Sequence, residues 1–348
     1  MENTTKQNKA VAAWLLAGIL MIVVQILLGG ITRLTGSGLS ITEWKPIMGA
    51  LPPMNDKEWQ HAFEGYQNIA QYKYINNHFT VDDFKFIFFW EWLHRLWARL
   101  LGVVFAIGFV YFLVKRYFRK DMVTPLIVLF ILGGVQGLIG WIMVASGLND
   151  TNLYVNHIKL AIHFISALVL LCYTLWFTFQ LLVPQSDLFN SPSLRKASVA
   201  LTGVLTLQLV YGAFMAGLKA ATYAPTWPGI NGALAPATLG SESWINFPLN
   251  VHFVHRTLAF LLVAGTTTWY VLALKVNTSA LFRKVRIIPV LLILLQALLG
   301  ILAVRTAPGI VPGKFGTYEL IAETHQLVAM FFLMAMTLML YMNRKNIL

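Results

Sequence analysis

Long apolar runs separated by shorter polar segments dominate this chain. A membrane-spanning α-helix needs about 20 such residues. Runs of that length begin near Val11, Phe86, Val123, Ile158, Ser198, Phe253, Ile287 and Ile321. The first run is longer than the apolar part of a secretory signal and no small-residue cleavage site follows it, so we interpret it as a retained helix. The pattern predicts an all-α integral membrane protein with eight transmembrane helices.

Composition and charge agree with this fold class. Hydrophobic residues make up 57% of the chain and charged residues 11%, against about 25% charged in soluble domains. The net charge of +12 arises from short basic clusters at span ends, which the positive-inside rule produces, so nucleic-acid binding is not indicated. The clusters place both termini in the cytoplasm. Without a visible mitochondrial presequence, the bacterial cytoplasmic membrane is the simpler location.

Two segments of the chain repeat, and they organise the rest. Gln136–Gly140 (QGLIG) recurs as Gln296–Gly300 (QALLG), and two intramembrane histidines recur at nearly the same spacing. Gln25 and Gln208 match less tightly, because the first outer loop is longer than its counterpart. An even number of helices separates equivalent positions, so the repeats cross the membrane in the same direction. This predicts parallel repeats about a pseudo-twofold axis along the membrane normal.

The repeat predicts two four-helix halves, at 1–185 and 186–348. The outer segments 35–85 and 220–252 are too long to be simple connections, and such loops are usually functional. We expect them to cap the outer mouth of each half, partly as interfacial helices such as one within 55–72.

Four histidines lie inside predicted spans, one on the second and one on the fourth helix of each half. They are His94 and His163 in the first half and His255 and His325 in the second. All four are expected at a similar depth, close to the outer boundary. Two imidazoles at matched depth on neighbouring helices can supply both axial nitrogens of a haem iron. The pattern therefore predicts one haem site in each half.

Simple hydrogen bonding between helices is the competing interpretation of each histidine. Ionisable groups in hydrocarbon cost about 2.5 kcal/mol or more, which makes the accidental presence of two matched pairs an unsatisfactory explanation. Zinc or copper is disfavoured because the carboxylates and thiolates that would complete such sites are missing. The single cysteine, Cys172, has no partner for a disulfide within the chain.

Glu91 distinguishes the two halves. It precedes His94 by one helical turn, whereas the equivalent position of the second half is His252. An ion pair with Arg95 on the same helix is one interpretation. The other is a carboxylate beside the first haem that moves protons or holds an oxygen intermediate. The sequence leaves both open.

Arginines near the predicted outer boundary are candidates for binding haem propionates, because guanidinium matches carboxylate bidentately. They are Arg33, Arg95, Arg99 and Arg256. Extension of these side chains toward the lipid headgroups is the alternative.

Several motifs together resemble the haem A synthase family, the haem O hydroxylases needed to build cytochrome oxidase, in its proteobacterial and mitochondrial form. They are GGITRLTGSGLSITEWKPIMGALPP at 29–53, EWLHR at 91–95, QGLIGW at 136–141, VHFVHR at 251–256 and ETHQ at 323–326. The resemblance spans most of the chain. The loop cysteine pair of some bacterial members is absent, and AGLKAATYAPTWPG at 216–229 departs from the usual AGLDAG continuation.

This resemblance implies an eight-helix pseudo-twofold bundle with His255 and His325 as axial ligands of a resident haem b. His94 and His163 would form the haem O pocket, with Glu91 as the catalytic carboxylate. The implied reaction oxidises one porphyrin methyl of haem O stepwise to a formyl group, with electrons passing through haem b. Both haem sites would lie toward the outer face of the membrane.

Questions of partners and rival functions follow from the same residues. Delivery of haem O by haem O synthase and a homo-oligomeric state are compatible with the sequence, which does not identify the electron donor. The rival function is a non-catalytic dihaem b-type electron carrier or haem-handling protein. A carrier needs no carboxylate in one half only, so Glu91 discriminates between them. A transporter is disfavoured by the scarcity of intramembrane charges away from the histidines.

Overall fold

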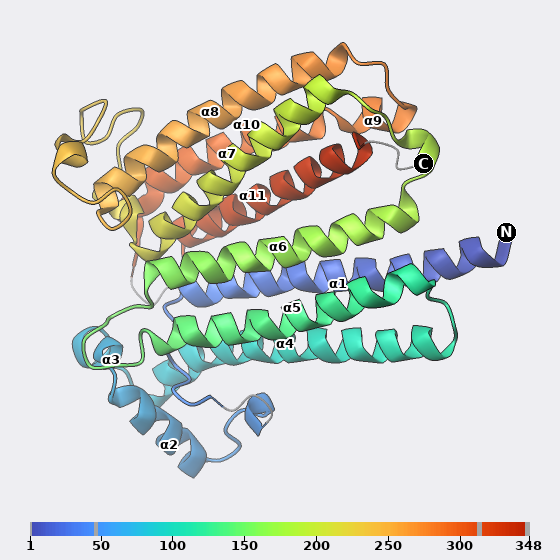
Figure 1. Ribbon diagram of the computed structural model, residues 1–348. Helices are drawn as coiled ribbons and strands as arrows, with labels where there is room; N and C mark the ends of the chain where they lie inside the picture. The colour runs from blue at the N-terminus through green and yellow to red at the C-terminus, as the bar shows by residue number, and fades with distance from the viewer. Residues whose placement is uncertain (1, 45–47, 312–314, 345–348) are drawn as a thin grey trace.

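A computed structural model describes residues 2–44, 48–311 and 315–344 of the chain (Figure 1). Positions 45–47 of the long motif at 29–53 lie outside the described residues. Within the described part the regular structure is helical, and eight helices are long and apolar enough to cross a membrane. The predicted fold class, an all-α multi-pass membrane protein, is confirmed.

The helices follow one another in a regular order. The span helices are α1 (Glu2–Leu34), α4 (Val81–Val114), α5 (Lys120–Ala145), α6 (His157–Leu182), α7 (Pro192–Gly217), α8 (Pro248–Leu274), α10 (Ile288–Thr306) and α11 (Thr317–Met342). Three shorter helices connect them: α2 (Asp56–Gln67), α3 (Ala70–Tyr74) and α9 (Ala280–Val285). Single 3-10 turns lie at Met48–Ala50, Gln185–Asp187, Ala220–Tyr223, Ala237–Gly240 and Ala307–Gly309.

Polar caps set the helix starts in the first outer segment. The Asn55 side chain accepts a hydrogen bond from the Glu58 amide (3.0 Å) and begins α2, so a helix is present within 55–72 as expected. A reciprocal capping box between Thr80 and Asp83 begins α4. Because this cap precedes the apolar run at Phe86, α4 begins at Val81, earlier in the chain than predicted.

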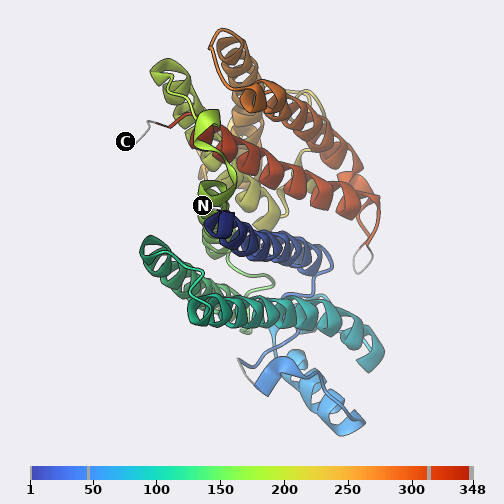
Figure 2. The same cartoon turned by 90° about the vertical axis from the view of Figure 1, so that its right-hand side faces the viewer.

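Each half is a ring of four helices. In the first half, α1 packs on α4, α4 on α5, α5 on α6 and α6 on α1. In the second half, α7, α8, α10 and α11 contact one another in the same cyclic order. Figure 2 shows the two groups beside each other, with α2 and α3 next to the first.

The interface between the halves also keeps its pattern when they are exchanged. Helix α6 packs on α7, α11 packs on α1, and α6 packs on α11. These contacts are consistent with the predicted pseudo-twofold relation. Buried side chains from both halves, including Ile22, Leu171, Met330 and Met336, form one continuous core across this interface.

The two ends of the bundle differ. Figure 1 shows both termini at one end, together with α9, and the long segments 35–80 and 218–247 at the other. The segment with α2 and α3 packs through its own aromatic cluster, in which Phe63, Tyr66 and Phe84 are buried. Burial raises the pKa of Tyr66 to about 12, so its hydroxyl stays protonated and donates to Gln71 (3.1 Å).

Candidate functional site

The structure brings the predicted histidine pairs together inside the two rings. His255 on α8 and His325 on α11 have ring centroids 6.4 Å apart and ring planes at 67°. His94 on α4 and His163 on α6 are close enough to interact electrostatically. The two histidines of each pair lie on diagonally opposite helices of their four-helix half, not on neighbouring helices as expected. This follows from the packing order, in which α4 packs on α1 and α5, and α8 packs on α7 and α10. Each pair therefore meets across its ring.

A glycine on the preceding span helix packs against each of these imidazoles. A Cβ added at the glycine would lie 2.8 to 3.4 Å from the histidine Cε1 atom. The pairs are Gly29 with His94, Gly140 with His163, Gly212 with His255, and Gly300 with His325. A larger residue at any of these positions would press on the ring, so the glycines fix how close each imidazole lies to the helix beside it.

A glutamine one turn before each glycine contacts the same imidazole. Its side-chain nitrogen lies 3.1 to 3.3 Å from a ring nitrogen in all four cases. The pairs are Gln25 with His94, Gln136 with His163, Gln208 with His255, and Gln296 with His325. Sequence comparison of the halves found these glutamines as repeat landmarks but gave them no role. The spacing Gln-x-x-x-Gly, present four times, was the signal for it.

Buried atoms of the second half fit a haem iron. The Nδ1 atoms of His255 and His325 and the Oε1 atoms of Gln208 and Gln296 are buried without a hydrogen-bond partner in the described structure. Imidazoles that bind metal usually donate their other ring N–H to an oxygen, and the two glutamine oxygens can accept such bonds. A metal bound at about 2 Å from one nitrogen of each ring fits the 6.4 Å ring separation. Among the described residues no group of three or more His, Cys, Asp or Glu side chains could hold a free metal ion.

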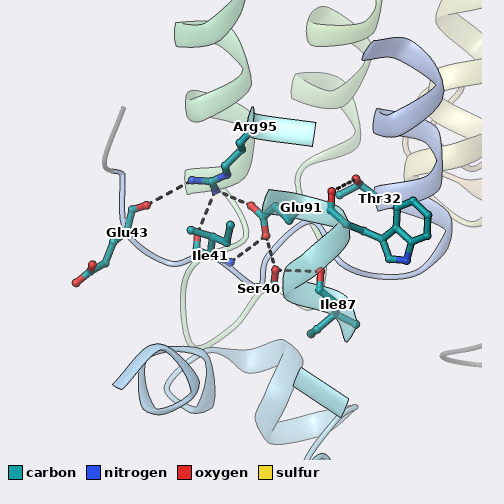
Figure 3. A network of polar contacts seen from close by, with 8 residues as sticks. Thr32, Ser40, Ile41, Glu43, Ile87, Glu91 and Arg95 are labelled. Atoms are coloured by element: carbon teal, nitrogen blue, oxygen red, sulfur yellow. Dashed lines mark hydrogen bonds and ion pairs between the residues drawn. The ribbon is translucent and has the colours of Figure 1, made fainter. Parts of the chain in front are cut away.

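Glu91 is 2% exposed and accepts hydrogen bonds from two directions (Figure 3). From the outer segment, the Ser40 hydroxyl donates to Oε2 at 2.7 Å and the Ile41 amide donates to the same oxygen at 2.9 Å. From its own helix, Arg95 forms an ion pair with Oε1 at 2.6 Å. The predicted ion pair is present, and it belongs to a larger network that joins α4 to the outer segment.

The arginines of the two halves hold the outer segments in the same way. Arg95 donates to the carbonyl of Ile41 at 3.1 Å. The buried Arg256 donates to the carbonyls of Ala224, Thr226 and Gly229 at 2.8 to 2.9 Å. The structure thus gives both guanidinium groups backbone partners, and their predicted contact with haem propionates stays a prediction.

Another candidate arginine, Arg33, has a buried Nε without a hydrogen-bond partner among the described residues.

His252 takes the place of Glu91 in the second half. It is 1% exposed, and its Nδ1 accepts a hydrogen bond from Arg256 Nε at 3.0 Å. The same i,i+4 arrangement therefore contains a carboxylate in one half and an imidazole in the other. His252 is buried although it lies close to the start of α8 at Pro248. His157, the first residue of α6, is bonded through Nε2 to the carbonyl of Ile245 (3.0 Å).

Consecutive glycines on α1 face the two halves. Gly29 lies against His94 of the first half, while a Cβ at Gly30 would overlap the carboxylate of Glu323 on α11. Glu323 is 4% exposed, and Gln326 donates to its Oε1 at 3.5 Å. Glu323 therefore lies in the interface between the two halves. The Gly29–Gly30 pair lets α1 lie close to both histidine-bearing helices.

Comparison with known proteins gives a consistent result. The model of the COX15-CtaA family, described as cytochrome oxidase assembly protein, matches residues 12–337. A protein named "Heme A synthase" from Parvibaculum lavamentivorans is 41% identical over 76% of this chain and 77% of its own length. Proteins of the same name from Flavobacterium johnsoniae and Rhodospirillum centenum are 36% and 44% identical, over 97% and 72% of this chain and 98% and 68% of their own lengths.

Proposed function

Because the chain belongs to the haem A synthase family of cytochrome oxidase assembly proteins, we propose that it oxidises haem O to haem A in a bacterial cytoplasmic membrane. One porphyrin methyl becomes a hydroxymethyl and, after a second hydroxylation and loss of water, a formyl group. Both termini lie in the cytoplasm and the histidine sites toward the outer face. The basic clusters lie at the end of the bundle that carries both termini, and the positive-inside rule places such clusters in the cytoplasm.

The two halves bind different haems. His255 and His325 in 186–348 bind the resident haem b, and His94 and His163 in 1–185 line the haem O pocket. When bound, haem b supplies a one-electron carrier inside the membrane. The buried partnerless atoms of the second pair and its glutamines support the assignment of the resident haem to that half.

Glu91 holds or moves the proton of the oxidation in the first half. The observation that carries this proposal is the asymmetry between halves at one position, Glu91 beside His94 and His252 beside His255. A buried carboxylate in a membrane-spanning helix has a specific reason to be there. To take a proton at Oε2, Glu91 needs only a rotation of the Ser40 hydroxyl, while Arg95 keeps Oε1 in place.

The outer segments exclude water from the sites. Arg95 and Arg256 hold segments from opposite halves against the outer helix ends through backbone carbonyls. Such closure strengthens the electrostatic effect of a buried carboxylate and protects a reactive site from side reactions. The non-catalytic carrier considered as the alternative gives the buried Glu91 network no role, and no described contact favours it.

Expression with and without a haem O source tests the activity. Cells that make haem O and express the chain are expected to accumulate extractable haem A, and cells without haem O are expected to contain none. The measurement is chromatography and mass spectrometry of extracted haems. Haem O that accumulates without conversion, although the protein is folded and carries haem b, would reject the proposed reaction and favour the carrier.

Gly300, which packs against His325, provides a second test in the proposed haem b site. Gly300→Ala places a methyl 3.1 Å from His325 Cε1 and is expected to weaken haem b binding by about 1–3 kcal/mol through overpacking. The measurement is haem b per purified chain. Gly203→Ala on α7 is the matched control, because no atom lies within 4 Å of an added Cβ there. Equal haem content in both variants would contradict a positioning role for Gly300.

A further inference from the structure

One of the four glutamine–histidine pairs has a different hydrogen-bond arrangement. Gln136 Nε2 lies 2.9 Å from the backbone carbonyl of His163 and 3.1 Å from its Nδ1. The hydroxyl of Ser166 donates to Gln136 Oε1 at 2.5 Å. The whole amide of Gln136 is therefore bonded, with partners on both its nitrogen and its oxygen.

These partners determine which way the amide of Gln136 faces. Amide oxygen and nitrogen are otherwise interchangeable in a fitted side chain. The carbonyl of His163 can only accept a hydrogen bond, so the group beside it must be the NH₂. Turning the amide over would place two acceptor oxygens 2.9 Å apart. It would also break the bond from Ser166 to Oε1, although the Ser166 hydroxyl can donate to the carbonyl of His163 at 3.0 Å as well.

The orientation of Gln136 determines the tautomer of His163. Because Nδ1 accepts the bond from the glutamine, the proton of the neutral imidazole is on Nε2. One ring nitrogen is then occupied as an acceptor and the other bears hydrogen. Neither offers a lone pair to iron while the Ser166 and Gln136 bonds persist.

The other three glutamines are not held in this way. The Oε1 atoms of Gln25, Gln208 and Gln296 are buried without a partner in the described structure. The residues three positions after the other histidines are Trp97, Leu258 and Val328, and none carries a hydroxyl. Each of these amides can turn so that Oε1 accepts the N–H of the ring nitrogen that it faces, which is Nε2 in His255 and His325. The other ring nitrogen is then free to bind iron.

We propose that Ser166 and Gln136 are positioning residues that keep His163 off the substrate iron. Haem O is then bound through His94 alone, and His163 offers its Nε2–H as a hydrogen-bond donor in the same pocket. This deepens the proposed function, on which it rests. A singly ligated haem leaves one iron position open for the oxidation and can leave after each turnover. The doubly ligated haem b of the other half stays in place.

The test exchanges Ser166 of the first half with Val328, the equivalent residue of the second half. Purified protein loaded with haem b receives one equivalent of ferric haem O without reductant. Electron paramagnetic resonance and cyanide binding then report the added iron. We expect a high-spin signal in the wild type and conversion to low spin in Gln136→Leu, which removes the donor to Nδ1. Ser166→Val leaves the His163 carbonyl as a partner of the amide, so partial conversion to low spin is expected there. Cyanide affinity is expected to fall about tenfold or more in the low-spin variant, the range typical for outer-shell changes.

Two further variants complete the exchange. Ser166→Thr retains the hydroxyl and is expected to keep the added haem high-spin. Val328→Ser places a hydroxyl beside Gln296 and is expected to shift part of the resident haem b to high spin. The haem b spectra of Gln136→Leu and Ser166→Val confirm that these variants are folded, because their mutations lie in the other half.

The outcomes separate two failures. A low-spin added haem in the wild type that is unchanged in Gln136→Leu would overturn the single-ligand inference and leave the proposed function standing. Absence of any haem O binding by the folded, haem b-loaded wild type would overturn the proposed function, and this inference with it.

Discussion

Glu91→Gln is expected to lower haem A formation by about 100-fold or more, the usual contribution of a positioned acid or base, while haem b stays bound. Glutamine has nearly the same volume, and its oxygen can still accept the bonds from Ser40 and Ile41. Its NH₂ group cannot accept the bond from Arg95, and the side chain cannot take up a proton. Haem A and haem O extracted from cells with a haem O supply provide the measurement. The haem b spectrum of the purified variant reports whether it is folded.

Two control variants separate proton chemistry from the structural role of Glu91. Ser40→Ala removes one bond of the network, the 2.7 Å contact to Oε2, and keeps the carboxylate. Asp82→Asn changes an exposed carboxylate on the same helix that pairs with Lys85. Both are expected to retain most haem A formation. If Ser40→Ala were as inactive as Glu91→Gln, attachment of the outer segment and not proton transfer would explain the requirement for Glu91.

Much of the fold follows directly from one-dimensional patterns. Eight spans could be predicted because each helix must satisfy its backbone hydrogen bonds within the bilayer, which makes long apolar runs unambiguous. The histidine pairs could be predicted because His94 and His163 recur as His255 and His325 within a repeated framework. The start of α4 was less accessible, because the capping box at Thr80 lies outside the apolar run.

Contacts between side chains and distant segments of the chain could not be predicted from the sequence pattern. The guanidinium of Arg256 binds carbonyls some thirty residues earlier in the chain, and backbone carbonyls have no residue signature. The overlap that a Cβ at Gly30 would make with Glu323 depends on how α1 and α11 pack across the halves. The distinct state of Gln136 depends on one hydroxyl, that of Ser166, which is absent from the equivalent position Val328.

His255→Ala and His325→Ala are each expected to abolish the low-spin b-type spectrum of the purified protein. Removing either imidazole eliminates one of the two proposed axial ligands. The centroids of the two imidazoles lie 6.4 Å apart inside the C-terminal four-helix half. Loss of an iron ligand costs more than loss of an outer-shell partner, which already weakens metal binding about 10–100-fold. The measurements are the absorption spectrum and the haem-to-protein ratio after purification.

Variants in the other half and at the surface show whether this loss is specific. His163→Ala removes an imidazole of the N-terminal site, and His61→Ala removes one whose side chain is 74% exposed. Both are expected to retain the haem b spectrum. Because bound haem stabilises the folded state by mass action, His255→Ala and His325→Ala are also expected to melt at lower temperature than His61→Ala. A low-spin b-type spectrum retained in both His255→Ala and His325→Ala would reject the ligand assignment, since it would require haem b to be held elsewhere.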